Sequence, residues 1–478
     1  SGVFPFVSYA LKLSEQPLAI TGTVHPNVMF LLDDSGSMDW EIMSGNHWAA
    51  CDYDPLEYYA QSGSTKGDCN KKITDGRIYI GNASGIDNTM TYLFSNTGNI
   101  YGNCSWYWSY GFECSDLETS EWRHKSSDLN FMYYNPDVIY LPWKGKCSGN
   151  NSCTNANFSS SRSNPKQGES GYSNTRNLKG QTYHVWFDTA GFTNTRPNIT
   201  DYSLGANSIV DLWDEHYKIE LDEINKAVIT GVTYDDPDGN SIGRLAQNLA
   251  TLTNTSACYN ILGSQSLVER IHAGELSVNS ADEEGCRTVL QASQNYANWY
   301  QYHRKRALSA KATISYLVDG EDGMRFGLTL INNNGSGSND VFVEVPLGEK
   351  DTFNGHNNSL LDALYEFNWE AQGTPLRKGL KKVGEYFDGD LSGKDDPILY
   401  SCQQNFTILL TDGQWNGNSP SIGNSDLDAY SNSLADVARF YYQKDLSLKK
   451  NNVPMNDFDT QMQQHMVTFM AAFGLENI

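Results

Sequence analysis

The chain has little positive charge and no long apolar run. Its 478 residues include 34 Lys and Arg against 57 Asp and Glu, which gives a formal net charge of −23. A surface of that sign repels phosphate backbones, so nucleic acid is not an expected partner. The longest apolar run, at residues 465–474, is too short to span a bilayer. We therefore expect neither a membrane span nor a nucleic-acid interface.

Signatures of catalysis are missing as well. The sequence has no H-E-x-x-H pair, and its nine histidines do not cluster as metal ligands. It also has no C-x-x-C pair, which argues against zinc or redox chemistry. We expect a protein that is not an enzyme. A hydrolase carried by the middle of the chain is the weakest of the alternatives.

Cysteines are present but concentrated in one region. Eight of the nine lie between residues 51 and 286, in a stretch rich in Tyr, Asn and Ser. This usage is typical of disulfides made outside the cytoplasm. The spacing does not determine the pairing, because eight cysteines allow many arrangements. We predict the local pairs Cys51–Cys69, Cys104–Cys114, Cys147–Cys153 and Cys258–Cys286, and leave Cys402 unassigned.

Strand and helix patterns alternate after about residue 290. Apolar periodicity predicts helices at 294–318, 359–367, 375–387 and 433–443, and strands at 324–332, 340–347, 404–413 and 465–474. The last strand and residues 27–32 have the apolar character of buried strands. This alternation is typical of a mostly parallel sheet with helices on both faces.

The middle of the chain has a different composition. Residues 39–289 hold eight of the eleven tryptophans and a long polar stretch at 146–174. We predict an α/β domain split between 25–38 and 290–478, with 39–289 as a large disulfide-stapled, aromatic-rich insertion and 1–24 as an N-terminal segment. Aromatic residues crowd the stretch 104–114. They form either the core of a small lobe or a surface for sugars or a protein.

Three loops at the expected carboxyl ends of strands carry oxygen ligands. Asp33, Ser35 and Ser37 follow the first strand, and alternation along an extended turn points all three the same way. Thr374 precedes a helix, and Asp412 ends a strand. In an open α/β sheet such loops meet in one crevice. Hydroxyls and carboxylates without His or Cys suit a hard divalent cation.

The five predicted ligands carry little negative charge. Only two of the five groups are carboxylates, so a bound cation keeps residual positive charge and an open coordination position. A partner's Asp or Glu carboxylate suits that position. Mg²⁺ fits a set in which some ligands act through water, although Mn²⁺ or Ca²⁺ would use the same oxygens. The competing interpretation is a strand-ending turn whose Asp and Ser cap the next helix.

Two weaker cation sites deserve separate interpretations. Asp34 and Asp39 form either a second site beside the first or a pair of solvated carboxylates. The stretch 388–396 imitates the start of a calcium loop, but Leu399 stands where an EF-hand has a bidentate Glu. The oxygens of that loop come from Asp388, Asp390, Ser392 and Asp396.

The pattern Asp33-x-Ser35-x-Ser37 with Thr374 and Asp412 resembles the metal-ion-dependent adhesion site of von Willebrand factor A domains. The resemblance implies a Rossmann-like fold, direct metal binding by the two serines and the threonine, and aspartates that act directly or through water. Four further stretches resemble the N-terminal region of PilC/PilY-type type IV pilus tip adhesins. They are residues 132–143, 294–311, 397–413 and 464–474.

The resemblance carries functional expectations. It implies a pilus-tip adhesin and pilus biogenesis factor, exported through the periplasm to the cell surface, that binds host or surface ligands or minor pilins. Roles in attachment, twitching motility and mechanosensing follow from the same family. A purely structural pilus assembly or priming factor with a non-adhesive metal site is the alternative. The family pattern also implies further elements of the domain, and a β-propeller with its own calcium site, beyond residue 478.

Overall fold

The structure is a computed structural model that describes the later part of the chain almost without gaps. The described residues are 24–43, 78–80, 88–90, 92–94, 125–127, 130–166, 174–186, 216–235, 243–253, 256–259, 262, 286–333, 340–348, 353–367, 372–413 and 415–473. Residues 1–23 and the aromatic stretch 104–114 lie outside them. So do four cysteines for which disulfides are predicted: Cys51, Cys69, Cys104 and Cys114.

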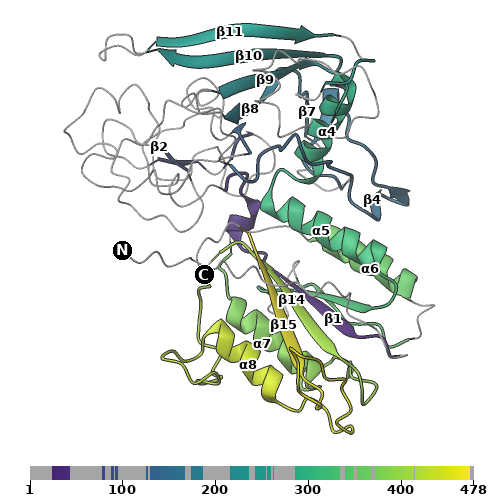
Figure 1. The fold of residues 1–478 in the computed structure, drawn as a ribbon. Coiled ribbons are helices and arrows are strands. Elements are labelled where there is room, and N and C mark those ends of the chain that lie inside the picture. Colours follow the sequence, from purple (N-terminus) through teal and green to yellow (C-terminus); the bar gives the residue numbers. More distant parts are fainter. Residues whose placement is uncertain are drawn as a thin grey trace, which may run out of the picture.

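A five-stranded sheet forms the centre of the α/β part (Figure 1). Its strands are β1 (Asn27–Leu32), β12 (Arg325–Leu330), β13 (Phe342–Val343), β14 (Asn405–Thr411) and β15 (Met466–Ala472). They lie in the order β13-β12-β1-β14-β15, and every pairing is parallel except that of β13. This is the strand order of a doubly wound sheet, so the predicted mostly parallel sheet is confirmed.

Helices cover both faces of this sheet (Figure 1). One face carries α5 (Arg306–Gly320) and α6 (Phe353–Glu366), and the other carries α7 (Leu376–Phe387) and α8 (Leu434–Gln443). Alternate residues of β1 reach the two layers. Phe30 and Leu32 belong to the core on the α5–α6 side, whereas Met29 belongs to the core under α7 and α8. A strand buried on both sides is apolar at every such position, as residues 28–32 are.

The single helix predicted at 294–318 is wrong, because two helices occupy this stretch. The first, α4 (Val289–Tyr302), ends at His303, and α5 begins at Arg306. Lys305 between them has an extended backbone. The apolar period continues across the break and conceals it in the sequence. The break turns three consecutive basic side chains toward buried acids, as described below.

A second sheet comes from the predicted insertion and was not foreseen. It is antiparallel in the order β11-β10-β9-β8, built from β8 (Gln181–Trp186), β9 (His216–Glu223), β10 (Lys226–Asp235) and β11 (Gly243–Leu252). Helix α4 lies beside it (Figure 1) and contacts β10. Tyr133 joins the two, since its hydroxyl donates to the Thr182 carbonyl at 2.5 Å and lies 2.9 Å from that of Tyr296.

Shorter elements complete the described part of this region. They are the pairs β2 (Ile78–Ile80) with β3 (Asn88–Met90), β4 (Lys146–Ser148) with β5 (Asn151–Ser152), and β6 (Ser161–Arg162) with β7 (Thr175–Arg176), together with the 3₁₀ turns η1 (Gly36–Asp39) and η3 (Phe158–Ser160). Two of the predicted disulfides are present, Cys147–Cys153 and Cys258–Cys286, and Cys402 is a free thiol.

Strand β15 is less buried than the sequence predicts. It lies at the edge of the sheet beside β14, and the side chains of Phe469 and Met470 are 51% and 43% exposed. The prediction of a strand is confirmed, but the prediction that it is buried is wrong. No helix within the described residues is both long and apolar enough to cross a membrane.

The contact between α7 and α8 gives a test of the fold. A Cβ added at Gly384 would lie 2.3 Å from the Tyr441 ring, whereas one added at Gly355 in α6 meets nothing within 4 Å. We expect Gly384→Ala to lower the free energy of unfolding by about 1–3 kcal/mol through overpacking. Gly355→Ala, the control, raises it by up to about 1 kcal/mol, because alanine favours a helix. Chemical unfolding of both variants checks this, and equal stabilities would contradict the α7–α8 packing.

Candidate metal centre

The loops that follow β1 and β14 meet at the same edge of the sheet. Both strands end there because they are parallel neighbours, with Leu32 beside Leu410. The amide of Asp33 then donates to the Leu410 carbonyl at 2.9 Å, which holds the start of the first loop against the end of β14. Asp412 follows two residues later. The parallel topology therefore brings together two carboxylates that are far apart in the sequence.

Hydrogen bonds within the first loop direct its hydroxyls toward Asp412. The Ser35 amide donates to Asp33 Oδ1 at 2.8 Å and so closes the turn. The hydroxyl oxygens of Ser35 and Ser37 then lie 3.3 Å apart. The Ser37 hydroxyl donates to Asp412 Oδ1 at 2.9 Å, across 375 positions of sequence. Four of the five predicted ligands thus belong to one polar cluster.

The fifth predicted ligand, Thr374, is held at this edge by its backbone. The Gly36 amide donates to the Gln372 carbonyl at 3.1 Å, which ties the loop before α7 to the loop after β1. Asn416 then clamps Thr374, accepting from its amide through Oδ1 at 2.9 Å and donating to its carbonyl at 2.9 Å. The Thr374 side chain is buried, and no hydrogen bond joins its hydroxyl to the other four ligands in the described structure.

Asp33 is a buried carboxylate with a like-charged neighbour. Burial and the charge of Asp412 raise its pKa from 3.8 to about 7, although hydrogen bonds from Ser35 and Thr411 act in the opposite direction. The Thr411 hydroxyl donates to Asp33 Oδ2 at 2.5 Å. Two such carboxylates in one buried cluster are stabilised by a proton or a cation between them. The site therefore needs positive charge to hold both acids ionised.

The groups at this edge fit a hard divalent cation. Carboxylate and hydroxyl oxygens converge there, and the Asp33–Asp412 repulsion is the kind that a bound cation relieves. The described chain contains no group of three or more His, Cys, Asp and Glu side chains placed to hold a metal. Two of the five predicted ligands, Asp33 and Asp412, are of these residue types, so this absence does not bear on the candidate site.

Arg306, at the start of α5, also contacts this cluster, and the sequence analysis missed it. Its Nη1 donates to Asp412 Oδ2 at 2.7 Å, and its Nη2 donates to the Ile42 carbonyl at 2.7 Å. The guanidinium carbon lies 5.0 Å from the centre of the Trp40 ring. The Arg306 and Asp412 side chains are only 1% and 0% exposed. One candidate ligand is thus paired with a fixed protein cation.

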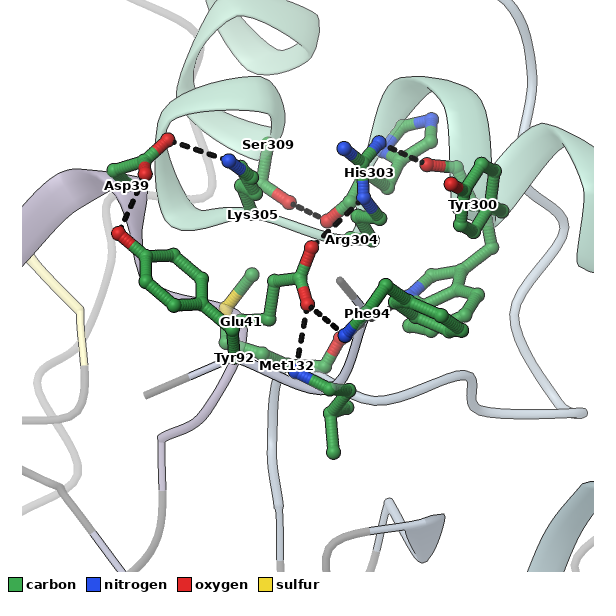
Figure 2. Close-up of polar contacts among 12 residues, drawn as sticks. Asp39, Glu41, Tyr92, Phe94, Met132, Tyr300, His303, Arg304, Lys305 and Ser309 are labelled. Atoms are coloured by element: carbon green, nitrogen blue, oxygen red, sulfur yellow. Dashed lines mark hydrogen bonds and ion pairs between the residues drawn. The ribbon is translucent and has the colours of Figure 1, made fainter. Parts of the chain in front are cut away.

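Two further ion pairs lie beside this one, made by the residues before Arg306. Lys305 Nζ contacts Asp39 Oδ1 at 2.7 Å, and Arg304 Nε contacts Glu41 Oε1 at 2.9 Å (Figure 2). The same acids also bind residues 92–94. Tyr92 donates its hydroxyl to Asp39 Oδ2 at 2.7 Å, and Glu41 Oε2 accepts the amides of residues 93 and 94. Arg304 and Lys305 therefore connect the start of α5 to the segment after β1 and to residues 92–94.

This network corrects both interpretations of Asp34 and Asp39. The two acids are buried, so they are not solvated carboxylates. They do not share a site either, because Asp34 Oδ1 accepts from the backbone and side chain of Asn332 at 3.0 and 3.1 Å, whereas Asp39 binds Lys305. A run of three bases inside an apolar helical pattern was the available signal that buried acids would be paired.

Two of the three carboxylates in the predicted weak calcium loop contact lysines. Asp388 pairs with Lys444, and Asp396 lies 3.9 Å from Lys449 while it accepts the Ile398 amide at 2.9 Å. Asp390 raises the pKa of Asp388, although burial is the larger cause. No three of these carboxylates form a ligand group in the described chain, and we propose no calcium site with Ser392 there.

The raised pKa of Asp33 predicts how stability depends on pH without metal. Between pH of about 4 and 7 the folded chain holds a proton on Asp33 that the unfolded chain has lost. The free energy of unfolding therefore falls as the pH rises through this window, by up to about 1.4 kcal/mol per pH unit. Urea unfolding in EDTA measures it. Asp33→Asn should flatten the slope, and the control Asp457→Asn, which removes an exposed carboxylate, should keep it. A wild-type slope unchanged by Asp33→Asn would contradict the assignment.

Comparison with known proteins finds relatives of this chain among pilus proteins. No family model matches the chain, and no solved structure matches it. Type IV pilus biogenesis factor PilY1 of Pseudomonas aeruginosa strain UCBPP-PA14 is 23% identical over an alignment of 520 residues, gaps included. This alignment covers 98% of this chain and 33% of that protein. PilY1 of strain PAK is 29% identical over 262 residues, 41% of this chain and 21% of its own length.

This chain therefore spans about a third or less of the length of these curated relatives. The alignment with the UCBPP-PA14 protein nevertheless includes almost all of it, the predicted insertion included. The sequence resemblance to pilus proteins at residues 132–143, 294–311, 397–413 and 464–474 thus agrees with the comparison. The predicted resemblance to PilC/PilY-type proteins is confirmed, since this chain is similar to the type IV pilus biogenesis factor PilY1 over almost its whole length.

Proposed function

We propose that this chain is a pilus-associated binding module that recognises a carboxylate of its partner through a Mg²⁺ ion. The observation that carries the proposal is the convergence of Asp33, Ser35, Ser37 and Asp412 at one edge of a doubly wound sheet, with Ser37 bonded to Asp412. That convergence also supports a von Willebrand factor A type of fold. Mn²⁺ or Ca²⁺ would find the same oxygens.

Each residue of the site has a distinct task. The hydroxyls of Ser35 and Ser37 face Asp412, so they can serve as neutral ligands on the loop side. Asp33 and Asp412 supply the charge, and Asn416 keeps Thr374 at the same edge. When bound, the ion supplies a Lewis-acidic position that an anionic oxygen of a partner completes. The chain's own groups therefore bind and orient, and the proposed function requires no catalysis.

The relatives suggest where this module acts. They are named as type IV pilus biogenesis factors, so we place this chain at the pilus tip or bacterial surface after export through the periplasm. Minor pilins and host or surface proteins are the proposed partners. Attachment, twitching motility and mechanosensing are the proposed roles. The disulfides Cys147–Cys153 and Cys258–Cys286 suit an oxidising compartment.

The burial of the site favours a second candidate function. Asp33, Ser35, Thr374 and Asp412 are all buried, which also suits a metal that only stabilises the fold. The chain would then be an assembly or priming factor for pili whose partners bind elsewhere on its surface. The two functions differ in what happens to pili when the site is destroyed.

Metal binding itself is tested by isothermal titration of the purified chain with MgCl₂. We expect one site in the wild type and loss of at least about tenfold in affinity in Asp33→Ala, because one of two charged ligands is gone. Asp390→Asn, which removes an exposed carboxylate of the rejected calcium loop, should bind as the wild type does. Equal heats for wild type and Asp33→Ala would refute a metal at this edge.

Experiments in bacterial cells distinguish the adhesion function from the assembly function. In bacteria that carry Asp33→Ala in the full-length protein, the adhesion proposal predicts a normal number of surface pili and reduced attachment to host cells. Wild-type cells in EDTA should show the same phenotype, with attachment restored by added Mg²⁺. Pilus counts by electron microscopy and attachment assays provide the two measurements. Loss of pili in the variant would favour the assembly function instead.

A further inference from the structure

Arg306 is the described basic side chain that contacts a candidate ligand of the metal. We propose that Arg306 is a positioning residue that weakens the site's hold on the divalent ion and leaves the bound ion more positive toward a partner. This inference rests on the proposed metal site. It concerns a residue outside the expected ligand set, at the start of α5.

The contacts of Asp412 limit how its carboxylate can bind an ion. Its Oδ1 accepts the Ser37 hydroxyl at 2.9 Å, and its Oδ2 accepts Arg306 Nη1 at 2.7 Å. Both oxygens therefore have a partner on the protein. A carboxylate held at both oxygens does not rotate freely to chelate an ion. Asp412 is thus restrained to offer at most its Oδ1 side, beside the serines, directly or through water.

The Arg306 side chain is itself held in place by other contacts. Its other terminal nitrogen, Nη2, donates to the Ile42 carbonyl at 2.7 Å, and its guanidinium lies over the Trp40 ring. Residues 40 and 42 continue the chain from the metal loop, so the arginine is anchored on the same segment whose ligands it influences. A charged group with these contacts stays near Asp412 with or without a metal.

Arg306 also changes the net charge of the site. Asp33 and Asp412 carry two negative charges when ionised, and Arg306 cancels one of them. A divalent ion then makes the site singly positive, whereas it would be neutral without the arginine. The protein's cation repels the ion across a buried region, where screening is weak. The same charge attracts an anionic oxygen to the open coordination position.

The neighbouring ion pairs indicate that Arg306 differs from its neighbours. Lys305 and Arg304 pair with Asp39 and Glu41, acids that also bind the insertion at residues 92–94 (Figure 2). Those pairs join parts of the fold and contact no candidate ligand. Lys305 therefore provides a matched control, with the same charge and a buried partner one position away.

Isothermal titration with MgCl₂ compares Arg306→Met, Lys305→Met and Arg306→Lys with the wild type. We expect Arg306→Met to bind Mg²⁺ about tenfold more tightly, because a repelling charge is gone and Asp412 is released. Lys305→Met should stay within about twofold of wild type, and Arg306→Lys within about threefold, because each leaves a cation at Asp412. Both Met variants should melt at a lower temperature without metal, because a buried acid loses its partner.

Tighter binding by a less stable protein is a result that a merely structural role does not give, since structural damage weakens a site. Unchanged or weaker binding in Arg306→Met, with Mg²⁺ bound by the wild type, would overturn the inference and leave the proposed function standing. Equal tightening in Lys305→Met would also overturn it. If Arg306→Met binds Mg²⁺ and the wild type does not, the inference about Arg306 holds but the proposed metal site of the wild type is refuted. If neither protein binds Mg²⁺, both the inference and the proposed metal site are refuted.

Folding of Arg306→Met is checked by circular dichroism before titration. If that variant does not fold, Arg306→Gln replaces it, since the shorter amide retains an N–H donor for the Ile42 carbonyl or Asp412 while it removes the charge. The expected tightening is the same, about tenfold. Arg306→Lys then separates charge from shape, and tenfold tightening in the lysine variant would contradict the electrostatic explanation.

Discussion

The repulsion between two buried carboxylates, Asp33 and Asp412, is the constraint on which the rest of the site depends. Parallel pairing of β1 and β14 brings them to one edge, and their burial excludes the water that would otherwise screen them. Only positive charge relieves such a pair. The chain supplies part of it through Arg306, and we propose that a divalent ion beside the hydroxyls of Ser35 and Ser37 supplies the rest.

Buried acids also join the segment after β1 to α5 and to residues 92–94. The loop that carries the metal ligands continues into Asp39 and Glu41, and the corner between α4 and α5 brings a base to each of them. These acids also hold residues 92–94 (Figure 2). A buried ion pair adds little net stability, but removing one partner is costly because a buried charge is left unpaired. One charged network therefore joins the loop after β1, α5 and residues 92–94.

Sequence periodicity predicted the parallel sheet well, because strands such as 27–32 and 405–411 are buried on both faces and are mostly apolar. Doubly wound topology then places the loops of Asp33 and Asp412 at one edge. Periodicity failed where tertiary partners decide the outcome. The break at His303 depends on acids far away in the sequence, and the edge position of β15 depends on what lies beside it. Arg306 was missed because pairing with Asp412 leaves no local pattern.

Anomalous diffraction from crystals of this chain soaked in MnCl₂ tests the proposed metal site most directly. We expect one manganese peak bounded by Asp33, Ser35, Ser37 and Asp412, about 2.0–2.3 Å from the oxygens that bind it directly. Arg306 should remain on the far oxygen of Asp412. A structure in which these side chains keep their contacts and the manganese lies elsewhere, or binds nowhere, would contradict the central claim.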